Sequence, residues 1–336
     1  NRGSSYAALG QPERAIQDFD HAIDDYLDKF VRFVSERWVP LLGITGGLDS
    51  RTLVAAFASA RTTFQSVTWL TMRTGQNERD LMDRQVALLA MPHRYLWIHL
   101  PRTRKKSKVE VRLDQLAAAG SSRTRPFAIV QALAGAFPDK RRDGEALTFV
   151  RGWGAEVLRG FYQLKKEPMT DFSAEEMARA YWMKVEDMGG DDDAKARALA
   201  LEAFSAFRRR ANFEDIEGLG YDPNDIFYLE HRMGTWGGLS LNELDPVMAS
   251  VIGFNARPIF LAAWGLPPAK RLTKQLLRSV VVRHQPELAA IPVIGLDGTT
   301  PRDRPCMKPR KIRKPLGARH DGPVRRALGR LRRLLR

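Results

Sequence analysis

Cysteine is nearly absent from this chain of 336 residues, which contains only Cys306. A disulfide within the chain is therefore impossible, and a zinc site built from several cysteines is excluded. The sequence also lacks any apolar run of the roughly 18 to 20 residues that cross a bilayer, and residues 1–30 show no basic and then apolar secretory pattern. These absences favour a protein of the reducing cytoplasm.

Acidic residues are in the minority, with 39 Asp and Glu against 54 Lys and Arg, for a net charge of +15. Most of this excess lies in residues 301–336, which contain 14 basic and 2 acidic residues, so the rest of the chain is close to neutral. Apolar residues recur at helical spacing from Val324 to Leu335 in that tail. The tail is either a basic amphipathic helix that contacts an acidic surface, such as nucleic acid or an anionic membrane, or a solvated segment.

Small and aromatic residues in residues 1–25 follow the pattern of two short helices packed across a glycine turn. These residues are Gly3, Tyr6, Leu9, Gly10, Ala15, Phe19 and Ala22. The pattern resembles one tetratricopeptide repeat, a unit that is stable in stacks of about three or more because one repeat cannot bury its own faces. Either further repeats precede Asn1 and offer a surface to a protein partner, or the segment is a helical hairpin that packs on the main domain.

From residue 26 onward the chain alternates between apolar strand patterns and amphipathic helix patterns. Strands are predicted at 39–44, 64–72, 94–100 and 146–150, and helices at 26–38, 78–90, 110–119 and 126–137. This alternation predicts an α/β fold, in which a parallel sheet has helices on both faces. Beyond Gly160 the periodicity is mostly helical and predicts a helical C-terminal half. Residues 294–336 are rich in Pro, Gly and charge, and are expected to form a linker and the basic tail.

The segment directly after the first predicted strand reads Thr45-Gly46-Gly47-Leu48-Asp49-Ser50. It opens a helix, and the turn between a strand and a helix is where α/β sheets bind ligands. Gly46 and Gly47 allow backbone amides to approach phosphate oxygens, the hydroxyls of Thr45 and Ser50 can donate, and the helix N-terminus attracts anions. Asp49 would repel bare phosphate, so its presence predicts a Mg²⁺ ion that bridges carboxylate and phosphate oxygens.

Residues 45–50 resemble the pyrophosphatase loop, SGGxDS, of the N-type ATP pyrophosphatases, also called the PP-loop family, which cleave ATP between its α and β phosphates. Two further segments are similar to motifs of the asparagine synthetases. Residues 151–162, RGWGAEVLRGFY, resemble SG[DE]GADE-x-x-GGY, and Lys274 begins a K-x-x-L-R helix. The resemblance covers about residues 26–293 and implies an adenine nucleotide alpha hydrolase-like fold, with the tetratricopeptide-like segment before it and the tail after it.

The resemblance also implies roles for individual residues. Thr45, Gly46, Gly47, Ser50 and Gly152 would bind the ATP phosphates. Asp49 and Glu156 would ligate Mg²⁺, with Glu156 standing where the family has Asp. Lys274 would be the catalytic lysine that stabilises charge on the acyl-adenylate and on the transition state that leaves it.

Several residues depart from the family pattern. Trp153 stands where asparagine synthetases place an acid and β-lactam synthetases a tyrosine, and an indole cannot act as a general acid or base. Val157 replaces a second acid. The proton of the nucleophile would then pass to the phosphate, or to Glu230 or His231, for which a structural role is the favoured interpretation. Arg51 replaces a small residue and either reaches a phosphate or is solvated.

The predicted function is that of an AMP-forming ligase, which adenylates a carboxylate with ATP and transfers the acyl group to ammonia or an amine. Because the chain has no cysteine suited to a glutaminase, ammonia would come from a separate glutaminase subunit, or the amine from the substrate itself. Two alternatives remain. One is a PP-loop ligase that modifies tRNA, and the other is a non-catalytic scaffold that keeps a degenerate nucleotide fold.

Overall fold

The computed structural model describes residues 12–71, 74–98, 126–137, 146–163, 167–182, 191–242, 244–245 and 247–296. All of these belong to one compact unit, Asn1–Cys306, while the second unit, Met307–Arg336, lies outside the described residues. The basic tail, Cys306, the predicted helix at 110–119 and the first part of the tetratricopeptide-like segment therefore lie outside them as well. No helix within the described ranges has the length and apolar character needed to cross a membrane.

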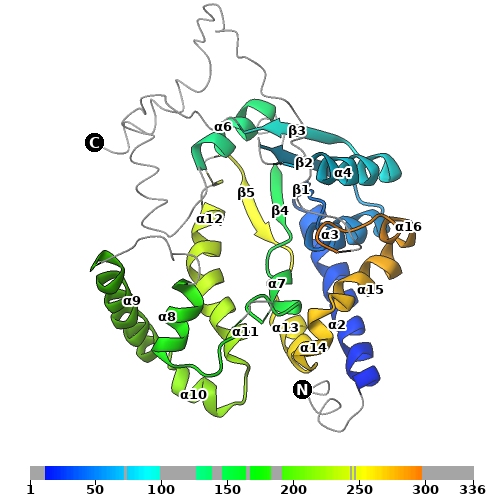
Figure 1. The fold of residues 1–336 in the computed structure, drawn as a ribbon. Helices are drawn as coiled ribbons and strands as arrows, with labels where there is room; N and C mark the ends of the chain where they lie inside the picture. Colours follow the sequence, from blue (N-terminus) through cyan, green and yellow to red (C-terminus); the bar gives the residue numbers. More distant parts are fainter. Residues whose placement is uncertain are drawn as a thin grey trace, which may run out of the picture. The chain divides into compact units, whose positions relative to one another are not determined.

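Five parallel strands form one sheet (Figure 1). They are β1 Val39–Gly43, β2 Gln65–Leu70, β3 His93–Trp97, β4 Leu147–Arg151 and β5 Ala249–Ile252, in the spatial order β3-β2-β1-β4-β5. The four predicted strands are confirmed within a few residues. β5 was missed, because its four residues are too few to show a strand period among the helical patterns on either side.

Helices account for most of the remaining described chain, which confirms the α/β class and the helical C-terminal half. In chain order they are α2 Pro12–Ser35, α3 Leu48–Ser59, α4 Gln76–Leu89, α6 Pro126–Ala136, α7 Ala155–Leu158, α8 Ala174–Trp182, α9 Asp191–Arg210, α10 Phe213–Gly218, α11 Pro223–Phe227, η1 Tyr228–Gly237, α12 Gly238–Asn242, α13 Arg257–Trp264, α14 Pro268–Leu272, α15 Gln275–His284 and α16 Pro286–Ala289. The element η1 is a π-helix of 10 residues, a rare form that is common at functional sites.

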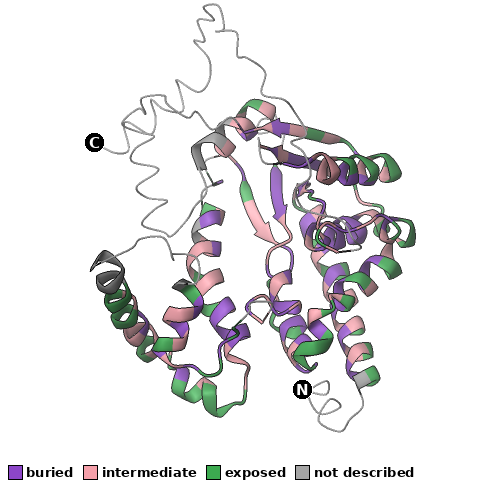
Figure 2. Ribbon diagram, in the orientation of Figure 1, coloured by how far each residue is buried: buried purple, intermediate pink, exposed green. Residues whose placement is uncertain are grey.

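Both faces of the sheet are covered, because alternate strand residues point to opposite sides. One face packs against Leu133 of α6 through Leu41, Val67, Leu96, Leu147 and Phe149. The other face, with Leu42, Leu70 and Val150, joins the larger core that contains α2, α3, α13 and α15. Strand β4 is buried except at Arg151, its last residue, and Figure 2 shows exposed residues on the outer helices.

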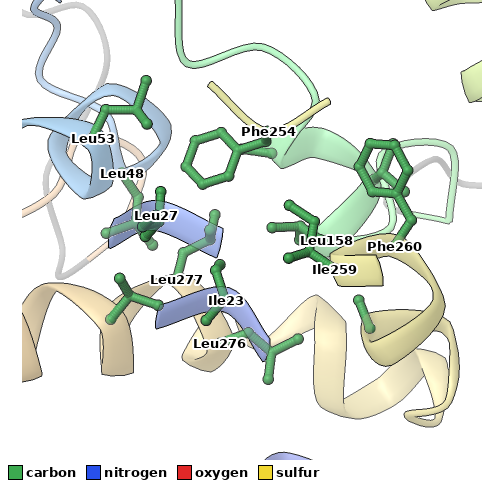
Figure 3. Packing of buried hydrophobic residues seen from close by; sticks show 14 of the residues in the cluster. Ile23, Leu27, Leu48, Leu53, Leu158, Phe254, Ile259, Phe260, Leu276 and Leu277 are labelled. Carbon is green, nitrogen blue, oxygen red and sulfur yellow. The ribbon is translucent and has the colours of Figure 1, made fainter. Parts of the chain in front are cut away.

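Helix α2 is an integral part of the larger core. Its buried stripe is Ala15, Phe19, Ile23, Leu27, Val31 and Val34. The helix contacts α3, α13 and α15, and Figure 3 shows Ile23 and Leu27 among the buried side chains of those elements. Arg283 of α15 also forms ion pairs with Asp20 and Asp24, both at 2.8 Å. Because α2 passes through residue 25 without a break, the part of the tetratricopeptide-like segment that is described packs on the main domain.

Replacement of a buried residue of α2 should therefore destabilise the whole domain. We expect Leu27→Ala to lower the free energy of unfolding by about 3 kcal/mol, since Leu27 is 0% exposed and its loss leaves a cavity in the shared core. Urea denaturation followed by circular dichroism measures this change. Leu88→Ala in α4, where the leucine is 41% exposed, is the matched control and should cost less than about 1 kcal/mol. Equal effects of the two variants would contradict the shared core.

Candidate functional site

The glycine turn at residues 45–50 lies where the strand order of the sheet reverses. From β1 the chain proceeds outward to β2 and β3 on one side, whereas β4 and β5 lie on the other side. The turn after β1 and the turn after β4 thus leave the sheet in opposite directions, and the crevice between two such turns is where open α/β sheets bind nucleotides. The sheet brings the segments at 45–50 and 151–162 together at this point, as predicted.

Hydrogen bonds between its own side chains hold the turn in shape. The hydroxyl oxygens of Thr45 and Ser50 lie 2.9 Å apart, and the Ser50 hydroxyl also accepts from the Thr45 amide at 3.2 Å. The Gly47 amide donates to the Thr45 hydroxyl oxygen at 3.2 Å. Thr45 and Ser50 therefore bond to each other across the base of the turn. The loop keeps this conformation through its own hydrogen bonds.

Gly46 is enclosed by two other segments. A Cβ at this position would lie 3.3 Å from Cγ of Glu78 and 3.3 Å from Cβ of Ile294. The Gly46 carbonyl accepts from the amide of Ile294 at 2.9 Å, and the Thr45 carbonyl accepts from Nε2 of Gln85 at 3.1 Å. Burial raises the pKa of Glu78. A larger residue than glycine would push the turn away from these supports.

Gly152 brings the end of β4 against the same turn. A Cβ on Gly152 would lie 3.0 Å from the carbonyl carbon of Asp49 and 3.0 Å from the amide nitrogen of Ser50. Glycine is therefore required here because two backbones touch. The structure assigns Gly152 this packing role next to the predicted phosphate loop.

The N-terminus of α3 has no side-chain cap. Its N-cap is Gly47, which has no side chain to accept hydrogen bonds from the amides of the first turn. The helix dipole and these amides favour a negative group at this end. The amides of the first turn of α3 therefore lie at a helix end without a side-chain cap, whereas the amide of Gly47 already donates to the Thr45 hydroxyl.

Arg159, which no sequence pattern singled out, lies directly against Asp49. Its Nε donates to Oδ1 of Asp49 at 3.2 Å and its Nη2 donates to Oδ2 at 2.9 Å. The side chains are 18% and 24% exposed, so the ion pair is largely shielded from solvent. The only signal in the sequence was a charged residue between Leu158 and Gly160, at a position where the family motif specifies nothing.

Glu156 and Lys274 complete the charged cluster. The Glu156 carboxylate accepts from the Gly154 amide at 3.1 Å and bonds to the Tyr228 hydroxyl, and burial together with the charge of Asp49 raises the pKa of Glu156 to about 7. Burial and the charge of Arg159 lower the pKa of Lys274. Lys274 has a left-handed backbone with φ of 59° at the N-cap of α15. The predicted metal and catalytic residues therefore meet at one place.

The donor set fits a magnesium ion in type, because Asp49 and Glu156 are neighbouring carboxylates, and burial together with the charge of Asp49 raises the pKa of Glu156. Both oxygens of Asp49 already accept from Arg159. Among the described residues, no group of three or more His, Cys, Asp or Glu side chains comes together as a metal site. A metal here would need phosphate oxygens to complete its coordination.

Arg51 neither reaches the phosphate cradle nor is solvated, so both sequence interpretations of it were wrong. It is 0% exposed, and its guanidinium donates to the carbonyls of Ile291 and, at 2.9 Å, Pro292. Arg51 thereby fixes the segment that runs on to Ile294 and supports Gly46. A charge on the first turn of a helix gave no hint of a partner 240 residues away in the sequence.

His231 lies among aromatic rings. It stacks on Phe227 at a centroid distance of 4.8 Å and meets the edges or faces of Phe204, Phe207 and Tyr181. Burial, and to a smaller degree Arg232, lower the pKa of His231 to about 4. A structural role for His231 agrees with this packing.

Trp153 takes part in a stack of rings and cations beside the loop. The guanidinium of Arg151 lies 4.1 Å from the centre of the Trp153 ring, and the rings of Trp153 and Trp236 lie 4.7 Å apart. Trp153 stands where the motif that this segment resembles has an acid. In this chain the position therefore holds an indole ring packed against an arginine and a second tryptophan.

Comparison with known proteins adds little to this description. No model of a protein family matches the chain, and no curated protein does. Among solved structures, the chain is similar to NMN synthetase from Francisella tularensis, with 11% identity and a TM-score of 0.28 over 41% of this chain and 58% of that chain. The chain thus spans less than two thirds of that protein. The nucleotide-binding interpretation depends on the strand order and the loop geometry described above.

The packing of His231 predicts a loss of stability in acid. Because the pKa of His231 is near 4 in the folded protein and about 6.5 when unfolded, the unfolded state binds more protons between these values, and stability falls as the pH drops from about 6.5 to 4. We expect His231 to account for about 2 to 3 kcal/mol of that fall. Urea denaturation at several pH values should show a shallower slope for His231→Phe than for the unchanged protein. His21→Phe, at an exposed position of α2, is the control, and an unchanged slope in His231→Phe would contradict the assignment.

Proposed function

We propose that this chain is an ATP-dependent ligase of the PP-loop type, which adenylates a carboxylate and transfers the acyl group to ammonia or an amine. The observation that carries the proposal is the convergence of three separate segments at the switch point of the sheet. The turn at 45–50, the carboxylate of Glu156 and the amine of Lys274 surround the Arg159–Asp49 pair. A phosphate cradle beside two carboxylates and a lysine is what phosphoryl and adenylyl transfer requires.

The turn and the N-terminus of α3 would hold the β and γ phosphates of ATP through backbone amides. Asp49 and Glu156 would hold Mg²⁺ together with the phosphates, and the metal would supply neutralisation of their charge. Arg159 would share Asp49 with that cation. Lys274 would place its ammonium against the α-phosphate, where negative charge develops.

In the first step an oxygen of the substrate carboxylate attacks the α-phosphorus, the bond between the α-phosphorus and the bridging oxygen breaks, and pyrophosphate leaves with the electron pair. In the second step the amine nitrogen attacks the acyl carbon, and the bond from that carbon to the AMP oxygen breaks. The amine proton passes to the phosphate of the departing AMP, because Trp153 cannot accept it and His231 is enclosed by aromatic rings. The nucleophile is either ammonia, supplied by a separate glutaminase subunit, or an amino group of a substrate.

A non-catalytic nucleotide-fold scaffold is the second candidate. The observation that favours it is the pairing of both Asp49 oxygens with Arg159, next to an aromatic side chain at position 153. If Asp49 never leaves Arg159, the site binds a nucleotide without turning it over. Pyrophosphate release therefore separates the two candidates.

Binding and turnover can be tested separately. Titration calorimetry with the α,β-methylene analogue of ATP and Mg²⁺ should show saturable binding to the unchanged protein. Gly152→Val should weaken this binding by about tenfold or more, since its side chain would push against the backbone of Asp49 and Ser50. No binding of the analogue at millimolar concentration would overturn both candidates.

The lysine should affect turnover more than binding. With ATP, Mg²⁺ and pools of carboxylates and amines, we expect pyrophosphate release by the unchanged protein, and a rate lower by about 100-fold or more in Lys274→Met. Affinity for the analogue should change only a few-fold. Lys270→Met, at an exposed position of α14, is the matched control and should keep the full rate. Analogue binding without pyrophosphate release from any pool would favour the scaffold.

A further inference from the structure

A pocket of about 540 Å³ lies in the helical half of the chain, among α11, α13, α14 and the loop that precedes α11. Its lining includes none of the charged residues Asp49, Glu156, Arg159 and Lys274 of the candidate site. A volume of this size is typical of sites that bind small organic molecules. The pocket is therefore a candidate for a second ligand.

Aromatic and aliphatic side chains form the walls of this pocket. The rings of Tyr221 and Trp264 meet edge to face, with their centroids 5.6 Å apart, and Leu266 and Pro267 add apolar surface. Leu219 also lines the pocket and is 69% exposed. Because Tyr221 and Trp264 are themselves partly exposed, the apolar body of a ligand can contact both rings.

The charges in the lining leave one carboxylate without a cation. Arg271 donates to both oxygens of Asp225, at 2.9 and 2.7 Å, so these two charges balance each other. Asp222 accepts instead from the backbone amide of Asn224 at 2.8 Å, from Nδ2 of Asn224 at 3.1 Å and from Nε2 of Gln163 at 2.6 Å. These donors are uncharged, and within the ranges that the structure describes Asp222 forms no ion pair. The pocket therefore carries an excess of negative charge.

This combination of apolar surface and negative charge determines which class of ligand fits. Asp222 would repel an anion, and a neutral apolar ligand would shield the carboxylate from water without replacing its solvation. A hard metal ion takes about six oxygen ligands, whereas the lining offers two carboxylates, one of them held by Arg271. An organic cation fits both parts, because its charge pairs with Asp222 and its body contacts rings that also attract cations.

We propose that this pocket binds an organic cation with an apolar body, such as an arylalkylamine, with the ammonium at Asp222 and the body against Tyr221 and Trp264. The inference goes beyond the proposed function, since it assigns a second ligand to other residues of the chain. It holds whether or not the turn at 45–50 binds ATP.

Three indole compounds of matched size test the class of ligand. Tryptamine, tryptophol and indole-3-propionate share one ring and one linker, and end in an ammonium, a hydroxyl and a carboxylate, respectively. Saturation-transfer NMR titrations of the whole chain, at neutral pH and constant ionic strength, measure the three dissociation constants. We expect saturable binding of tryptamine, with an affinity about tenfold or more above that of either other compound, because only tryptamine pairs with the carboxylate.

Replacement of Asp222 by asparagine locates the charge that binds the ammonium. Asparagine can still cap α11 by accepting from the Asn224 amide. The buried Oε1 of Gln163, which has no hydrogen-bond partner, can accept from the new side-chain amide. Asp222→Asn should therefore keep its fold, as circular dichroism would show, and bind tryptamine about tenfold or more weakly. Asp215→Asn, which removes a charge from an exposed position of α10 outside the lining, is the matched control.

A second variant tests the aromatic wall. Tyr221→Leu keeps an apolar side chain but removes the ring, so it should weaken tryptamine binding by a few-fold. Tryptamine binding no tighter than that of tryptophol would overturn the inference, and so would equal affinities for tryptamine in Asp222→Asn and Asp215→Asn. Failure of the ATP analogue to bind, with tryptamine binding intact, would count against the proposed function alone.

Discussion

The end of β4 passes so close to the turn after β1 that no side chain fits between the two backbones. A Cβ on Gly152 would lie 3.0 Å from atoms of both Asp49 and Ser50. This contact fixes how the residues that follow Gly152 meet the residues around Asp49, so Arg159 and Glu156 reach Asp49 from α7 and the turn after it. The charged cluster is therefore a consequence of one approach between two parallel strands, which the sheet holds in register.

A second constraint positions the lysine. Arg271 in α14 is 1% exposed, and it donates to both oxygens of Asp225 at 2.9 and 2.7 Å and to the Val157 carbonyl at 3.3 Å. A buried ion pair of this kind adds little net stability, because removing two charges from water is costly. It does specify geometry, since it joins α14 and α11 to the helix that contains Glu156. Lys274 follows Arg271 by three residues, with its amide bonded to the Arg271 carbonyl at 3.0 Å, and it lies within reach of the charges of Arg159 and Asp49.

The amino-acid sequence predicts the parts of this molecule that depend on local pattern. The four longer strands and the glycine turn between β1 and α3 follow from apolar periodicity and from a motif of six residues. The meeting of residues 45–50 with residues 151–162 was expected from the motifs that these two segments resemble. The missed features depend on distant partners. Arg51 bonds to carbonyls about 240 positions later in the chain, and Arg159 pairs with Asp49 across 110 positions. The residues next to a charged residue in the sequence do not indicate which distant carbonyl or carboxylate it will contact in the folded chain.

The distribution of charge gives the site its individual character. Compared with the motif that it resembles, the segment at 151–162 has an arginine at 151 in place of serine, and Trp153 and Val157 in place of two acids. Arg159 adds a further positive charge, and it pairs with the remaining acid of the turn. Compared with that motif, the segment therefore has less negative and more positive charge. A site changed in this direction holds anions more strongly through its own side chains, and depends less on a divalent cation to offset their charge. Arg159 is also oriented, because two hydrogen bonds to Asp49 fix its guanidinium, and a fixed donor of this kind recognises an acceptor by position as well as by charge.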